Sequence, residues 1–245
     1  MSWTPPAPAR LLEALDATWS ALERRPLGPW TLRRGGGGGN RASSVQPRAA
    51  RPDDLDAALA AVVRQAADWG QPAIVQLGPE DAALDAALSA RGWAVADSNV
   101  IYAAPAAAFA PPPRDEGLLA RVAAPLALLD ALWDEGGVGP ARRAVMAAVD
   151  RPKTRLIARA GDRPAGACFV AADGSVAVMS ALYVSPAHRR QGVGRLAVLG
   201  AADWAREQGA DTLALAVGGD NAPARALYEG LGFAPVCGYV YRRAP

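Results

Sequence analysis

Residues 189–200, RRQGVGRLAVLG, place two arginines and two glycines directly before an apolar stretch. An exposed helix N-terminus presents main-chain N–H groups without intrahelical partners, together with the positive end of the helix dipole. Glycines let an anion approach those N–H groups, and arginines add charge-assisted hydrogen bonds. The segment is therefore a candidate phosphate-binding loop, provided that a strand leads into it and a helix leads out of it.

The spacing disfavours two common phosphate loops. The segment lacks the GxxxxGK[ST] pattern of nucleoside triphosphatases, and Leu196 and Ala197 follow without the third glycine of a dinucleotide-binding loop. A second GVG, at 136–140, has neither a preceding strand nor an adjacent arginine, and it predicts a helix–helix connection. A plain turn that starts a helix remains the alternative for 189–200 on this motif alone.

The elements around this loop supply the required context. Leu196, Gly200 and Trp204 recur every four residues, which predicts a helix with one buried stripe that ends at Gly209. A strand, loop, helix and strand in this order require two locally parallel strands, so we expect an α/β fold with a mixed (α+β) sheet. Apolar runs predict strands at 118–123, 154–161, 164–174, 175–184, 212–218 and 236–243, and helical spacing predicts helices at 125–136, 141–150 and 221–233.

The first half of the chain repeats the pattern of the second half. An offset of 140 residues, the difference between Gly232 and Gly92, also places Gly78 on Gly218 at the ends of two buried strands. The shared order of strand, helix, Gly-aromatic pair and strand predicts two tandem copies of one fold.

We expect the two domains to span residues 1–104 and 114–245, joined by a stiff, Pro/Ala-rich linker at 105–113. Within the first domain, five consecutive glycines at 35–39 predict a mobile hairpin connection with no helix directly after it. The alternative is that these glycines cover the acceptor site of the other half.

The loop and a later segment resemble conserved segments of the GNAT superfamily of N-acetyltransferases. Arg189-x-x-Gly192-x-Gly194, after a strand ending in LYVSP, is similar to the acyl-CoA loop of that family. Residues 221–233, NAPARALYEGLGF, are similar to its Asn-x-x-Ala-x-x-Leu-Tyr-x-x-x-Gly-Phe segment. The resemblance covers residues 115–245, with its specific motifs confined to 182–233.

The resemblance implies acetyl-CoA as cosubstrate and direct transfer of its acetyl group, in a ternary complex, to a primary amine of a small molecule or peptide. It also implies a degenerate N-terminal half, because the offset of 140 sets Leu88 against Tyr228 and Asp81 against Asn221. The first half also has no Arg-x-x-Gly-x-Gly pattern before its presumed helix. We therefore expect one active site per chain, in the second half.

The resemblance assigns roles to individual positions. The main chain of Leu182 and Val184 pairs with the pantetheine arm, and N–H groups across 190–195 hold the diphosphate. The Asn221 side chain contacts the cofactor, and Tyr228 protonates the departing thiolate. The implied cofactor-binding residues are Leu182, Val184, Arg189, Arg190, Gln191, Gly192, Val193, Gly194, Arg195, Asn221 and Ala224, and the implied catalytic residue is Tyr228.

No residue is assigned as the general base. Many relatives are expected to place a carboxylate on the strand before the loop, but 175–184 contains no acid. Ser180 either holds a water or is a buried hydroxyl, and Asp134 and Glu135 are better explained as a solvated helix end. His188 is expected at the surface beside the loop. The missing carboxylate leaves a non-catalytic acyl-CoA-binding module as the alternative function.

Composition excludes several other classes of partner. A net charge of +2 gives no reason to expect nucleic acid or an anionic membrane surface. One histidine and two separated cysteines, Cys168 and Cys237, argue against a metal site and predict buried thiols in strands. The N-terminus lacks a signal-peptide pattern, and no apolar stretch approaches membrane-spanning length, so we expect a cytoplasmic protein.

Overall fold

The computed structural model describes residues 3–47, 51–113 and 119–245. The strands are β1 (Glu23–Leu27), β2 (Trp30–Arg34), β3 (Gln46–Pro47), β4 (Ile74–Leu77), β5 (Ala94–Pro105), β6 (Leu119–Val122), β7 (Lys153–Ala160), β8 (Arg163–Asp173), β9 (Val176–Val184), β10 (Thr212–Gly218) and β11 (Ala234–Arg243). The helices are α1 (Pro8–Ala17), α2 (Asn40–Ser43), α3 (Leu55–Asp68), α4 (Ala82–Ala90), α5 (Ala127–Glu135), α6 (Pro140–Ala148), α7 (Val193–Glu207) and α8 (Ala222–Gly230), with 3-10 turns η1 (Pro79–Asp81), η2 (Ala106–Ala108) and η3 (Pro186–His188).

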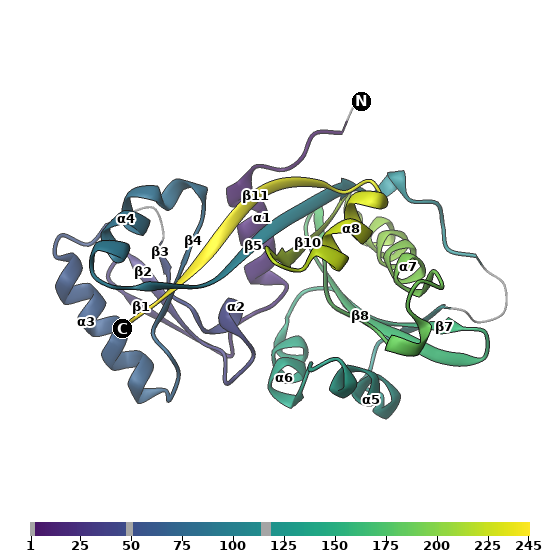
Figure 1. Ribbon diagram of the computed structural model, residues 1–245, viewed down its shortest axis with the longest axis horizontal. Helices are drawn as coiled ribbons and strands as arrows, with labels where there is room; N and C mark the ends of the chain where they lie inside the picture. Colours follow the sequence, from purple (N-terminus) through teal and green to yellow (C-terminus); the bar gives the residue numbers. More distant parts are fainter. Residues whose placement is uncertain (1–2, 48–50, 114–118) are drawn as a thin grey trace.

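One mixed sheet of eight strands runs through both halves of the molecule, in the order β4-β11-β5-β10-β9-β8-β7-β6 (Figure 1). A second sheet, β1-β2-β3, belongs to the first half. β9 and β10 are parallel neighbours joined through α7, which confirms the predicted strand–loop–helix–strand unit and the mixed α/β fold. The second GVG lies between α5 and α6, as predicted.

The helices cover both faces of the large sheet. Buried residues of α7 and α8, such as Val198 and Tyr228, pack in one cluster with β8 and β10. On the opposite face, α5 and α6 pack through Trp133 and Val145, and α1 packs through Leu11. In the described ranges, no helix combines the length and apolarity that crossing a bilayer requires.

The internal repeat predicted from the sequence is present in the structure with the same offset. Adding 140 to the bounds of α4 gives the bounds of α8, and β5 begins 140 residues before β11. The pairing of β5 with β11 skips Ala96 on one strand and Val236 on the other, which again lie 140 apart. Equivalent residues therefore occupy equivalent places, down to the β-bulges.

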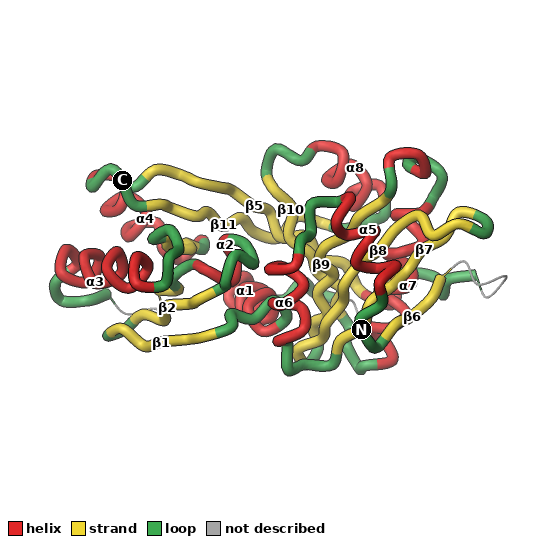
Figure 2. Tube along the Cα trace, turned by 90° about the horizontal axis from the view of Figure 1, so that it is seen from below, coloured by secondary structure: helices red, strands yellow, loops and turns green. Residues whose placement is uncertain are grey.

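The two halves exchange their last strands. β5 of the first half pairs with β10 of the second over the whole of β10, from Thr212 opposite Pro105 to Gly218 opposite Asn99. β11 of the second half pairs with β4 of the first. β5 and β11 also pair with each other, and they run side by side from the first half into the second (Figures 1 and 2). The division at residue 104 stays a prediction, since one sheet serves both halves.

The segment predicted as a stiff linker is instead anchored over its first half. Pro105 ends β5, Ala106 is buried, and Phe109 packs on Phe233 with ring centroids 5.2 Å apart. The Arg206 guanidinium donates to the main-chain oxygens of Ala106 and Phe109, at 2.7 and 2.9 Å. The prolines of this segment predicted a stiff linker, and nothing in the sequence pattern indicated that Phe109 packs into the core. Residues 114–118, at the start of the predicted second domain, lie outside the described residues.

The five glycines connect β2 to its antiparallel partner β3, as predicted, but their surroundings differ from the prediction. The short helix α2 follows them directly, and Gly38 is buried against α6 of the other half. A Cβ on Gly38 would lie 2.3 Å from Cγ2 of Val145, and the Trp19 indole donates to the Gly38 oxygen at 3.2 Å. Here glycine permits close packing of the two halves, which composition alone does not distinguish from chain freedom.

Candidate cofactor site

The loop before α7 has the backbone geometry that an anion site requires. Gly192 is the N-cap of α7 in the left-handed region, with φ of 82°. No side chain of the described residues caps this helix end, and its first main-chain bond runs from the Leu196 N–H to the Gly192 oxygen at 2.9 Å. The N–H groups of Val193, Gly194 and Arg195 therefore point out of the helix end toward solvent.

Three exposed arginines lie in this loop and in the first turn of α7, at positions 189, 190 and 195. The Arg189 Nε donates to the Val184 oxygen at 3.3 Å, which holds that side chain against the end of β9. Gln191 turns its side chain onto its own loop, donating to the Ala187 oxygen at 3.0 Å. Gln191 would therefore bind a ligand through its main chain. Three guanidinium groups and a helix dipole make this end of the molecule attractive to phosphate.

β9 presents an open edge next to the loop. Its pairing with β10 extends over Val176–Val178 and stops there. Beyond that point β9 bulges at Ala181, whose φ is 52°, and the Trp133 indole donates to the Ala181 oxygen at 3.0 Å. Leu182 and Val184, predicted to bind the pantetheine arm, follow this bulge on the unpaired edge. An extended ligand segment adds to such an edge as a strand would.

The end of β9, the start of α7 and helix α8 meet around Gly194. A Cβ on Gly194 would lie 3.2 Å from Cδ2 of Leu227 and 3.8 Å from Cγ2 of Val184. Asn221 is the N-cap of α8, and its Oδ1 accepts the N–H of Ala224 at 3.1 Å. The Asn221 oxygen therefore serves the helix, and its amide nitrogen is the group left for a cofactor. The structure brings the two predicted motifs together.

Tyr228 lies in the core beside these elements, with 5% of its surface exposed. Its ring meets the edge of Phe233 at a centroid distance of 5.7 Å. Burial raises the pKa of Tyr228 far above its ordinary value, and the nearby Cys168 thiol adds to the shift. The phenol keeps its proton at neutral pH, and the raised pKa makes it a weaker acid than an exposed tyrosine. Contact between its hydroxyl and a thioester sulfur stays a prediction.

Asp134, Glu135 and Ser180 all have partners within the protein. Asp134 pairs with Arg143, which supports the interpretation of a helix end. The Tyr183 hydroxyl donates to Glu135 at 3.0 Å, and burial together with that carboxylate raises the pKa of Tyr183. Ser180 accepts a hydrogen bond from a residue of the first half, a contact that no sequence motif indicated.

The two thiols are poor nucleophiles. Burial raises the pKa of Cys168 to about 12, and it also raises the pKa of the half-buried Cys237. We expect a disulfide reagent at pH 8 to leave Cys168 unmodified in the folded protein and to modify both thiols after unfolding, because the thiolate is the reactive form. Mass spectrometry of labelled peptides measures this, and fast labelling of Cys168 in the folded protein would contradict it.

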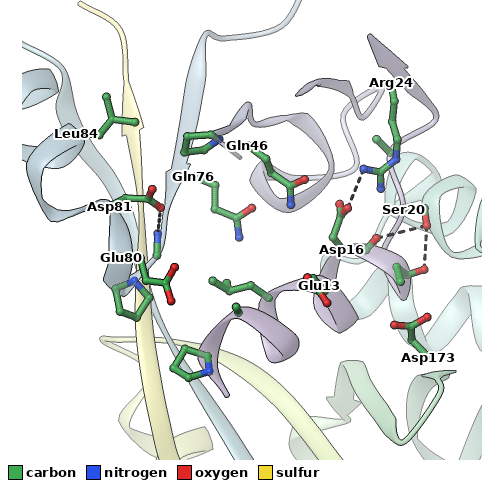
Figure 3. A pocket seen from close by; sticks show the side chains of 18 of the residues that line it. Glu13, Asp16, Ser20, Arg24, Gln46, Gln76, Glu80, Asp81, Leu84 and Asp173 are labelled. Atoms are coloured by element: carbon green, nitrogen blue, oxygen red, sulfur yellow. Dashed lines mark hydrogen bonds and ion pairs between the residues drawn. The ribbon is translucent and has the colours of Figure 1, made fainter. Parts of the chain in front are cut away.

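A cavity of about 1030 Å³ lies between α1, β4 and η1, and residues of the second half such as Asp173 also line it (Figure 3). Gly78 and Asp81 line it, and the offset of 140 makes them the counterparts of Gly218 and Asn221. Here the carboxylate of Asp81 accepts the Gly78 N–H at 2.8 Å, and Glu13 and Glu80 stand nearby. Asn221 of the second half, predicted to contact the cofactor, is therefore replaced in the first by an acidic residue that bonds to its own loop, which fits one cofactor site per chain.

Comparisons with known proteins agree with this geometry. Residues 126–233 match the acetyltransferase (GNAT) family. Streptothricin acetyltransferase of Streptomyces lavendulae is 49% identical over 57 residues, which are 23% of this chain and 30% of the length of that relative.

Two solved structures resemble nearly the whole chain. A GCN5-related N-acetyltransferase from Kribbella flavida has a TM-score of 0.73 at 19% identity, covering 97% of this chain and 95% of that one. A tandem GNAT protein from the clavulanic acid biosynthesis pathway, without AcCoA, has a TM-score of 0.63 at 15% identity, covering 99% and 89%. Residues 126–233 of the C-terminal half thus match the acetyltransferase (GNAT) family, and the chain as a whole has the two-half fold of these solved structures.

Proposed function

We propose that the chain is an acetyl-CoA-dependent N-acetyltransferase acting on a primary amine. One observation carries the proposal: the uncapped N-terminus of α7 opens beside the unpaired edge of β9. A CoA thioester has a diphosphate and an extended amide-bearing arm, and these neighbouring features match the two groups. The match of residues 126–233 to the acetyltransferase (GNAT) family supports acyl transfer as the chemistry.

The proposed roles follow from this fit. The N–H groups of 190–195, with the guanidinium groups of Arg189, Arg190 and Arg195, hold the diphosphate. The main chain of Leu182 and Val184 binds the pantetheine arm. The side-chain amide of Asn221 and the first turn of α8 at Ala224 complete the cofactor site.

In the proposed reaction, the acetyl group passes directly from the thioester to the amine within a ternary complex. The nitrogen of a neutral amine attacks the thioester carbonyl carbon, and the carbon–sulfur bond breaks. A main-chain N–H near Val184 stabilises the charge that develops on the oxygen. Tyr228 donates its proton to the departing sulfur. The proton lost from the amine passes to solvent, since no base is assigned, and the Tyr228 phenolate takes a proton back from solvent before the next turnover.

Replacing Tyr228 by Phe should leave acetyl-CoA affinity within about twofold and reduce kcat about 10- to 100-fold, because the phenyl ring keeps the packing and loses the proton. Calorimetric titration measures binding, and thiol release across a panel of amines measures turnover. Tyr102→Phe is the matched control: Tyr102 is also buried and contacts α8 by donating to Glu229 at 2.6 Å. Equal turnover in Tyr228→Phe would remove the proton-donor role.

The alternative is a non-catalytic acyl-CoA-binding module. The absence of any acid on β9 favours it. The same two assays decide: acetyl-CoA binding without turnover of any amine would favour the module, and turnover of any amine would exclude it.

A further inference from the structure

Helix α2 of the first half carries Arg41 to the strand that forms the cofactor site. The Arg41 Nη1 donates to the Ser180 hydroxyl oxygen at 3.3 Å, joining residues 139 positions apart. The guanidinium carbon lies 5.9 Å from the ring centroid of Trp19. α2 faces the second half and lies next to α6 in both views (Figures 1 and 2).

Packing on both sides fixes the place of α2. Before it, the glycine run is pressed against α6, where Gly38 meets Val145. After it, the buried Arg33 donates to both the main-chain oxygen and the hydroxyl of Ser44, at 2.7 and 2.6 Å. Residues on either side of α2 therefore fix the position of Arg41. The glycine run, which the sequence predicts to be a mobile connection, is one of the segments that do so.

The sheet sets how far a thioester can reach. A ligand arm that starts at the α7 N-terminus runs along β9 from Val184 toward Val178. It must stop before Val178, where β10 joins β9. The acyl end therefore lies along 180–182, and Ser180, the residue that Arg41 contacts, is at that end. An amine attacking the carbonyl from the α2 side passes Arg41.

Among residues 3–47, 51–113 and 119–245, no carboxylate forms an ion pair with Arg41. Its contacts in the described structure are Ser180 and the Trp19 ring, with the phenol of Tyr241 in its electrostatic reach. The neighbouring Arg33 is occupied by Asp16, Ser44 and Gln76. The Tyr241 hydroxyl is buried and has no hydrogen-bond partner among the described residues. A plain ammonium is repelled by an unpaired guanidinium.

We propose that Arg41 determines acceptor specificity by binding a carboxylate that lies within a few bonds of the reacting amine. This rests on the proposed acetyl transfer. The acceptor is then an amino acid or an amino-acid-like molecule, whose single negative charge matches the one guanidinium at Ser180. A planar guanidinium binds a carboxylate through paired hydrogen bonds. The carboxylate is unchanged in the reaction, and the amine is the group that is acylated.

The test compares each standard amino acid with its carboxamide, using acetyl-CoA and thiol release. Wild-type protein should favour the acid over the amide by about 10-fold or more in kcat/KM. Arg41→Gln should lower kcat/KM for the acid about 10- to 100-fold, chiefly through KM, and leave the amide within about twofold. Arg41→Lys, which keeps the charge, should recover part of the loss. Arg34→Gln, which removes an exposed arginine of the same half, is the control.

Several results would overturn the inference. Equal use of acids and amides by the wild type would do so, as would an equal loss for both in Arg41→Gln, which would indicate a structural role. A change in acetyl-CoA affinity in Arg41→Gln would count against it as well. If the Gln variant does not fold, Arg41→Met, which keeps the apolar stem near Trp19, takes its place. Failure of the wild type to bind acetyl-CoA removes the proposed function and this inference together; binding with turnover of amides alone removes only this inference.

Discussion

A chain that begins at Ala106, and so lacks β5, should fail to fold, whereas a chain that begins at Ala94 should unfold cooperatively. β5 is the neighbour of both β10 and β11 in the large sheet. Without it, β10 loses seven paired positions, and the buried side chains of Ile101 and Tyr102 are lost from the two faces. Burying one large apolar side chain contributes about 1.5–3 kcal/mol, and a whole domain is stable by only about 5–15 kcal/mol.

Circular dichroism during heating distinguishes the two chains. A synthetic peptide of residues 94–105, added to the chain that begins at Ala106, should restore a cooperative transition, and a peptide of the same composition in scrambled order should not. A cooperative transition in the Ala106 chain alone, within a few degrees of the full-length protein, would show that the exchanged strand is dispensable.

The strand exchange has a functional consequence. Because β5 and β11 each complete the sheet of the other half, the two halves cannot separate without breaking main-chain hydrogen bonds. A residue of the first half can then hold a fixed position at the site of the second. Arg41 at Ser180 is such a residue. The first half takes part in the proposed reaction through this contact.

Local signals explain what could be predicted from the sequence. Turn residues and apolar periodicity marked the loop at Gly192, the stripe on α7 and the repeat, because each of these depends on residues close together in the chain. The two motifs at Gly194 and Leu227 were expected to meet, and they do.

Long-range choices explain what could not be predicted. The sequence pattern of β5 is the same whether the strand pairs within its own half or with the other half. The sequence therefore could not predict the strand exchange. The contact of Arg41 with Ser180 depends on how the halves dock, and the only hint was an arginine after an unusual glycine run. Glycine has two physical uses, unusual φ and close approach, and the run at 35–39 uses both: Gly36, Gly37 and Gly39 have positive φ, and Gly38 is packed.

Replacing Gly192 by Val should weaken acetyl-CoA binding about 100-fold or more. The φ of 82° at this N-cap is strongly unfavourable for a β-branched residue, so the loop must change conformation to accept it. That change turns the N–H groups of Val193 and Gly194 away from the diphosphate. Losing two or three hydrogen bonds of about 1–1.5 kcal/mol each gives this loss of affinity. Calorimetric titration with acetyl-CoA measures it.

Gly209, just beyond the other end of α7, supplies a matched control. Its φ is 78°, and a Cβ at either glycine would meet nothing within 4 Å, so the two substitutions impose similar strain without a packing clash. Both variants should lose similar thermal stability, on the order of 1–2 kcal/mol. Only Gly192→Val should lose acetyl-CoA, because main-chain N–H groups are presented at the N-terminus of a helix and carbonyl oxygens at its C-terminus. Equal acetyl-CoA affinity in the two variants would mean that the diphosphate binds elsewhere. The assignment of residues 189–195 to the cofactor site would then be wrong.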